Sequence, residues 1–142
     1  MAGYSGTPLA RKLGIKEDYR VAILNAPGNF LAELGPLPAA ALIVPRLRSS
    51  LNLILFFAAS QSELRKRSAK LAARLTPDGM LWVAWPKRSS GVPTDLSFEV
   101  VQRAGLKRGL VDTKVCAVNE VWSGLRFVVR LRDRPSTGSK KG

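Results

Sequence analysis

The sequence contains no histidine and only one cysteine among its 142 residues. Without histidine, the chain cannot build a Ser-His-Asp or Cys-His catalytic site, and it has no imidazole to bind a metal. A single cysteine cannot form a disulfide within the chain, so we expect a free thiol. We therefore predict no catalytic residue of these nucleophilic classes and no metal site.

Acidic residues and long apolar runs are scarce as well. Only 10 Asp and Glu accompany 23 Lys and Arg, which gives a formal net charge of +13. A chain this basic binds polyanions weakly whether or not such binding is its function. The longest apolar run, residues 53–59, has the length of a buried strand and is far shorter than the ~18 residues of a membrane span. With no signal-like start and a free cysteine, we expect a cytoplasmic protein without membrane contact.

The length predicts one domain, and an apolar content of 46% is too high for a disordered chain. We place the domain at residues 1–132 and expect a basic, disordered tail at 133–142. Cap residues and apolar spacing predict helices at 8–13, 30–34, 60–75 and from 94 or 95 to 105. Continuous or alternating apolar runs predict strands at 21–24, 53–58, 81–85, 113–121 and 125–131.

One segment, residues 41–47, is only a weak strand candidate. Pro45 places it at a sheet edge or a bulge, because proline has no N–H to donate. About five residues separate it from the next strand, whereas a parallel crossover needs a dozen or more. We therefore expect this segment to run antiparallel to its neighbour or not to form a full strand.

Alternation of strands and helices with near-continuous apolar strands predicts an α/β fold. We expect a three-layer, Rossmann-like domain whose mostly parallel sheet ends in a C-terminal antiparallel hairpin, turned at residues 122–124. The arrangement resembles a shortened Rossmann-type methyltransferase fold. Leu13-Gly14-Ile15 before Val21 resembles the entry to the first strand of that fold, and Leu75 to Leu81 resembles the exit from its fourth helix. A fold resemblance does not imply an activity.

Four blocks carry a second resemblance. They are GYSGTPL with KLGI (3–9 and 12–15), NAP (25–27), LWVAWPK (81–87), and GLVDTKVCAV with WSGL (109–118 and 122–125). In this order they resemble a family of small bacterial proteins catalogued only as a domain of unknown function, over residues 3 to about 131. The resemblance implies a bacterial, single-domain protein and implies no activity.

The carboxyl ends of the predicted strands are the best place for a ligand. Helix starts there offer free N–H groups, and Lys87 adds positive charge, which favours a small anion. The candidate ligand-binding residues are Asn25, Pro27, Gly28, Ser60, Trp85, Lys87 and Asp95. The structural alternative is that Asn25, Ser60 and Asp95 are caps and Trp85 is core. The favoured hypothesis is a non-catalytic binding or regulatory module for a small anionic ligand.

A divergent S-adenosylmethionine-dependent methyltransferase is a weaker alternative. The turn after the first strand has one glycine, and Pro27 removes a backbone donor. Arg46, near the end of the 41–47 segment, and Arg48, directly after it, stand where an acidic residue would bind a ribose. No dinucleotide or Walker motif occurs. We therefore predict no bound cofactor.

A nucleic-acid-associated basic protein is the other alternative. Lys66, Lys70 and Arg74 share one face of the 60–75 helix and are the candidate phosphate contacts. A solvated helix face is the favoured explanation for them, and no aromatic residue lies between them. Trp122 and Ser123 are candidate partner contacts at the hairpin turn. Cys116 reads as a buried, inert thiol.

Overall fold

The computed structural model describes residues 8–48, 50–130 and 133 of the chain. The elements, in chain order, are α1 (Leu9–Leu13), β1 (Arg20–Leu24), α2 (Phe30–Leu34), β2 (Leu42–Ile43), β3 (Leu51–Phe57), α3 (Gln61–Ala73), β4 (Leu75–Pro86), the 3-10 turn η1 (Arg88–Ser90), α4 (Phe98–Lys107), β5 (Leu110–Ala117) and β6 (Trp122–Val129). No helix among the described residues is long and apolar enough to cross a membrane.

The strands form one six-stranded sheet in the order β2-β1-β3-β4-β6-β5. The first four of these strands are parallel, and β6 is antiparallel to both β4 and β5. The central strand β3 is buried along almost its whole length, as a strand covered on both faces must be. The sheet thus confirms the predicted α/β fold with a C-terminal antiparallel hairpin.

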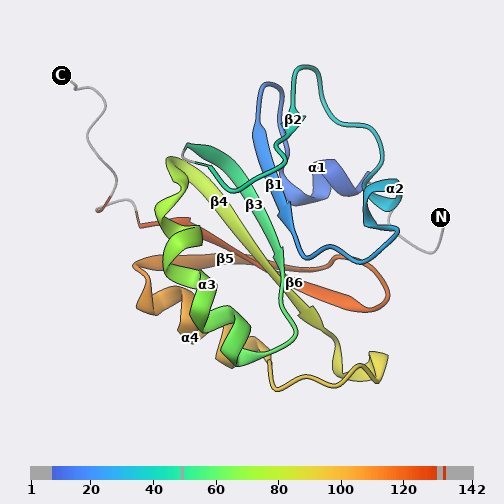
Figure 1. Cartoon of the computed structure of the whole chain (residues 1–142), viewed down its shortest axis with the longest axis vertical. Helices are drawn as coiled ribbons and strands as arrows, with labels where there is room; N and C mark the ends of the chain where they lie inside the picture. The colour runs from blue at the N-terminus through green and yellow to red at the C-terminus, as the bar shows by residue number, and fades with distance from the viewer. Residues whose placement is uncertain (1–7, 49, 131–132, 134–142) are drawn as a thin grey trace.

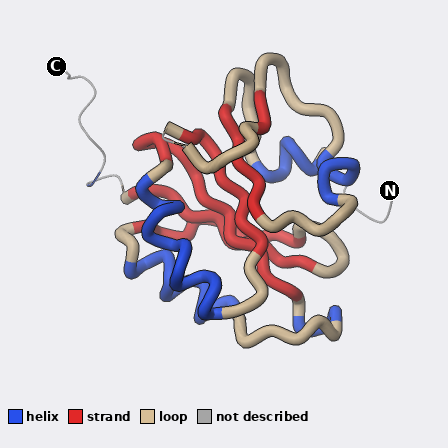
Figure 2. The backbone as a smooth tube through the Cα atoms, viewed as in Figure 1, coloured by secondary structure: helices blue, strands red, loops and turns tan. Residues whose placement is uncertain are grey.

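Helices cover both faces of the sheet (Figures 1 and 2). On one face α3 and α4 lie side by side, and their buried Leu64, Leu71 and Val101 pack on Ile54, Phe56 and other strand residues. On the opposite face α1 and α2 pack through Leu13 and Phe30 onto Leu53, Leu55 and Trp82. The domain therefore has three layers, with one apolar core on each side of the sheet.

Local signals explain several of the element ends. Gly14 ends α1 in a left-handed conformation (φ 92°), which glycine adopts without strain. The buried indole N–H of Trp82 donates to the carbonyl of Leu13 (2.7 Å), which fixes the end of α1 to the sheet. Ser60 caps α3, and its hydroxyl accepts from the N–H of Glu63 (3.1 Å). The predicted cap Thr7 of the first helix lies outside the described residues.

The helix α4 approaches the sheet closely at Gly105. A Cβ atom at this position would lie 2.1 Å from Cε1 of Phe127, whose ring is fully buried. Only glycine allows so close a contact between a helix backbone and a core aromatic ring. Gly105 therefore sets the distance of α4 from β6.

Two strand predictions need correction. The segment 41–47 contributes only Leu42 and Ile43 at the sheet edge, which agrees with the expected edge position and with the alternative that it forms no full strand, but it is parallel to β1 instead of antiparallel. It pairs with Arg20 and Val21 at the amino end of β1, so the short link to β3 crosses β1 near that end and need not run along the length of the strands. The hairpin prediction was also misplaced, because residues 122–124 belong to β6 and the turn lies at 118–121.

The cap of α4 was also misassigned. Ser97, not Thr94 or Asp95, caps this helix by accepting from the N–H of Val100 (3.3 Å). The side-chain amide of Gln102 on α4 donates to the Asp112 carboxylate on β5 at 3.3 Å, which connects this helix to the edge of the sheet.

Candidate functional site

The strand order reverses beside β1. The chain passes from β1 to β2 on one side and then returns to β3 on the other side. In open α/β sheets the carboxyl ends of two such strands border a crevice where ligands bind. Here Asn25 follows β1, while Ala59 and Ser60 follow β3.

Side-chain hydrogen bonds connect the two strand ends through Glu63 in the first turn of α3. The Asn25 amide donates to Oε2 of Glu63 (2.8 Å), and the N–H of Ala59 donates to Oε1 (3.1 Å). The carboxylate of Glu63 thus reaches back to the residue before the cap, one position earlier than a capping box requires. Asn25 adopts a left-handed conformation (φ 59°), which asparagine tolerates better than most residues.

A third loop joins the same place. Asp95 Oδ1 accepts from the N–H of Gln61 (2.8 Å), and the Gln61 side-chain amide donates to the carbonyl of Asp95 (3.0 Å). The hydroxyl of Thr94 donates to the carbonyl of Ala59 (2.6 Å). We call the group of Asn25, Ser60, Gln61, Glu63 and Asp95 the switch-point cluster.

The cluster unites three of the predicted ligand-binding residues, Asn25, Ser60 and Asp95. Its electrostatics differ from the expectation, however. The first N–H groups of α3 already donate to Asp95 and Ser60, and two carboxylates lie at the positive end of this helix. This arrangement disfavours a small anion at the start of α3.

The other candidates lie around the cluster in different roles. Trp85 is only 7% exposed and belongs to the core beneath α3 and α4, as its structural alternative proposed. Lys87 is half-buried, and its N–H donates to the carbonyl of Val121 (2.7 Å). Gly28 is exposed, and a Cβ there would meet no atom within 4 Å, while Pro27 is half-buried in the same turn.

Trp122 and Ser123 are less available to a partner than expected. Trp122 is half-buried and packs edge-on against the ring of Phe57, with centroids 5.1 Å apart. Ser123 lies between Trp85 and Ala117 in the register of β6. Both residues complete the sheet and its second core.

The single thiol lies on β5, half-buried. Burial raises the pKa of Cys116, and the nearby cations Lys12, Lys114 and Arg126 lower it by a smaller amount. A raised pKa reduces the thiolate fraction and therefore the nucleophilicity of the sulfur. The described residues also contain no group of three or more His, Cys, Asp or Glu side chains that could hold a metal ion.

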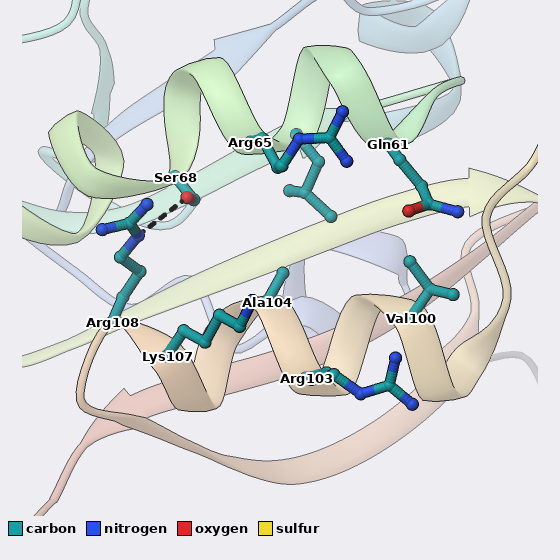
Figure 3. A pocket seen from close by; sticks show the side chains of 9 residues that line it. Gln61, Arg65, Ser68, Val100, Arg103, Ala104, Lys107 and Arg108 are labelled. Atoms are coloured by element: carbon teal, nitrogen blue, oxygen red, sulfur yellow. Dashed lines mark hydrogen bonds between the residues drawn. The ribbon is translucent and has the colours of Figure 1, made fainter.

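A second polar region lies between α3 and α4 (Figure 3). A groove of about 190 Å³ runs between the helices, with Gln61 and Val100 at one end and Ser68 and Arg108 at the other. Four basic side chains line it and define what we call the basic groove: Arg65 from α3, Arg103 and Lys107 from α4, and Arg108, which directly follows α4.

The charges of the basic groove are uncompensated. No Asp or Glu lines it, and Arg65, Arg103 and Lys107 are exposed and form no ion pair within the described part of the chain. Only Arg108 has a fixed position, because its Nε donates to the Ser68 hydroxyl (3.0 Å). The predicted basic face is adjacent: Lys66 and Lys70 are exposed on α3 outside the groove lining, and Arg74 is half-buried at the end of the helix.

No protein-family model matches this sequence, and a search of curated proteins gives no match. Solved structures do match. A SAM-dependent methyltransferase from Aquifex aeolicus superposes with a TM-score of 0.56 at 13% identity, over 85% of this chain and 88% of that one. A TehB-like SAM-dependent methyltransferase from Corynebacterium glutamicum gives a TM-score of 0.54 at 13% identity, over 90% of each chain.

A third similar structure is the magnesium protoporphyrin IX methyltransferase of Synechocystis with bound SAH, with a TM-score of 0.57, 8% identity, and coverage of 86% of this chain and 78% of that one. At these identities the similarity shows the fold alone. The chain thus has the Rossmann-like fold of SAM-dependent methyltransferases. The resemblance to a small bacterial family stays a prediction.

The residues at the switch point do not match the usual way of holding an adenosyl cofactor. Pro27 has no N–H in the turn after β1, where such a site offers backbone donors. The short strand β2 is followed by Val44, Pro45 and Arg46, so no carboxylate stands at its end to bind a ribose. We therefore derive no methyl-transfer step for this chain.

Proposed function

We propose that the protein is a binding or regulatory module that holds a small molecule at the carboxyl ends of β1 and β3, against the switch-point cluster. The reversal of strand order beside β1 carries this proposal, because open α/β sheets bind their ligands at this point. The exposed amide of Asn25, held by Glu63 at 2.8 Å, supports it by placing a polar side chain at the crevice.

The chemistry of the cluster favours a ligand that donates hydrogen bonds. The carboxylates of Glu63 and Asp95 are acceptors with lone pairs to spare after their bonds within the protein. Hydroxyl and amino groups match such acceptors, whereas a phosphate would face two negative charges. The small anion favoured by the sequence is therefore the second ligand class, and Lys87 is the cation that the sequence analysis proposes for it.

A divergent SAM-dependent methyltransferase is the second candidate function. The observation that favours it is the fold similarity to the methyltransferases of Aquifex aeolicus and Corynebacterium glutamicum. The ribose and amino groups of SAM are hydrogen-bond donors, which suits the carboxylates of the cluster. Pro27 and the absence of an acid after β2 count against this function.

Isothermal titration calorimetry with SAM, S-adenosylhomocysteine, adenosine and inorganic phosphate tests the proposal. The decisive variant is Asn25→Gly, because glycine keeps the left-handed backbone at φ 59° and removes only the amide side chain. Asp18→Gly is the matched control, since Asp18 also has a positive φ (67°) but lies before β1, at the other end of the sheet.

The proposal predicts that one of these probes binds the wild type and Asp18→Gly equally and binds Asn25→Gly at least about tenfold more weakly, as the loss of a ~1.4 kcal/mol contact requires. Binding of SAM with transfer of its methyl group to any acceptor would favour the second candidate. An affinity that is unchanged by Asn25→Gly would contradict the location of the site at the switch point.

A further inference from the structure

The basic groove brings four cations together, and no Asp or Glu lines it. Its four cations come from helices about 40 residues apart in the sequence, as Arg65 and Arg103 show. We propose that this groove binds the phosphate backbone of a nucleic acid without reading its sequence. The proposal is independent of the ligand at the switch point.

The geometry of the groove fits a row of phosphates. From Gln61 to Ser68 the wall rises about 10 Å along α3, and a nucleic acid strand carries one phosphate per about 3.4 Å of axis. Three of the four cations are arginines, whose planar guanidinium donates two parallel hydrogen bonds to a phosphate. The groove is therefore long enough to contact more than one phosphate of a strand.

The side chains around the groove favour a nucleic acid over an anionic membrane. A helix that binds a membrane presents bulky apolar residues beside its basic ones. The exposed positions of α3 next to its cations are small or polar, such as Ser62, Ala69 and Ala73, and α4 adds a single bulky exposed apolar residue, Leu106. No aromatic side chain lines the groove, so base stacking would not contribute and binding would depend on salt.

The test measures fluorescence anisotropy of labelled single-stranded RNA and DNA at about 50 mM and about 200 mM salt. The groove variant is Arg103→Glu with Lys107→Glu. The matched control is Arg11→Glu with Lys16→Glu, which makes the same change of net charge at exposed positions on the opposite face of the sheet. Vesicles containing phosphatidylserine are titrated in parallel.

The proposal predicts that the groove variant binds either nucleic acid at least about tenfold more weakly at low salt, whereas the control loses no more than about threefold. The slope of log affinity against log salt also falls by about 1.4 for a single strand, since each lost phosphate contact removes about 0.7. Circular dichroism checks whether the reversed charges disturb folding. If they do, Arg103→Gln with Lys107→Gln replaces the groove variant, and its affinity for nucleic acid should also fall.

Three results would overturn the proposal. Equal losses in the groove variant and the control would mean that only net charge matters. Failure of the wild type to bind either nucleic acid at low salt would exclude the interaction. Vesicle binding that requires Arg103 and Lys107, together with nucleic acid binding that ignores them, would assign the groove to a membrane surface.

Discussion

The switch-point cluster and the basic groove meet at Gln61, yet they differ in whether their charged groups have partners within the protein. In the cluster, both carboxylates accept hydrogen bonds from neighbouring loops, so their charges contribute to the fold. In the groove, Arg65, Arg103 and Lys107 have no carboxylate partner in the described chain. Polar groups satisfied within the protein stabilise it, whereas unpaired surface cations leave stability almost unchanged and remain free for a partner.

The largest expected effect on stability comes from a substitution that displaces α4, one wall of the basic groove. In Gly105→Ala the new Cβ collides with the Phe127 ring, so α4 must shift away from β6. We expect the free energy of unfolding to fall by about 1–3 kcal/mol in urea titrations. Gly28→Ala is the control, because a Cβ at Gly28 meets nothing within 4 Å, and its stability should stay unchanged or rise slightly. Equal stability of the two variants would show that α4 does not depend on this contact.

Removing the Glu63 carboxylate from the switch-point cluster should lower the free energy of unfolding by less than Gly105→Ala does. Glu63→Ala leaves the Asn25 amide and the Ala59 N–H without their acceptor and removes a negative charge from the start of α3. We expect a loss of about 1 kcal/mol in thermal or urea unfolding. Glu99→Ala changes the same residue type in the first turn of α4, where the side chain has no bonded partner among the residues that the structure describes, and should lose only about 0.3 kcal/mol of stability. A loss as large as that of Glu63→Ala would contradict the role of the cluster.

Replacing the second carboxylate separates its charge from its hydrogen bond. Asp95→Asn keeps an oxygen acceptor for the N–H of Gln61, so we expect a loss of only about 0.5 kcal/mol, from the weaker interaction with the helix dipole. Asp95→Ala removes the acceptor as well and should lose about 1 kcal/mol. Urea titrations of both variants measure the difference, and identical stabilities would mean that the hydrogen bond contributes nothing.

The smallest effect on stability is expected from substitutions of the cations in the basic groove. Arg103→Gln with Lys107→Gln removes two unpaired positive charges from a chain of formal net charge +13. We expect the free energy of unfolding to change by less than about 0.5 kcal/mol, in the stabilising direction, because repulsion between cations decreases. Thermal unfolding at low salt measures it, and a clear loss of stability would show that these cations have structural partners.

Elements with signals inside a few neighbouring residues could be predicted from the sequence. Gly14 ends α1, and Ser60 with Glu63 starts α3, as the local cap chemistry requires. The buried run around Leu53–Phe57 identified the central strand β3. Asn25, Ser60 and Asp95 were placed at one end of the sheet because strand ends of a parallel sheet meet there.

Features that depend on the choice of a distant partner could not be predicted in this way. Thr94, Asp95 and Ser97 are all good cap residues, and the local sequence does not tell which of them caps α4 and which one reaches α3. The same holds for the basic groove. Arg103 and Lys107 become neighbours of Arg65 only because α3 and α4 cover the same face of the sheet.

Amide NMR spectra of the isotope-labelled protein, titrated with a short single-stranded RNA at low salt, test the contrast between the two regions most directly. The account predicts chemical-shift changes along the basic groove, at Arg65, Arg103, Lys107 and Arg108, while Asn25 and Glu63 keep their positions. Shifts concentrated at Asn25 and Glu63, with the groove unchanged, would contradict it.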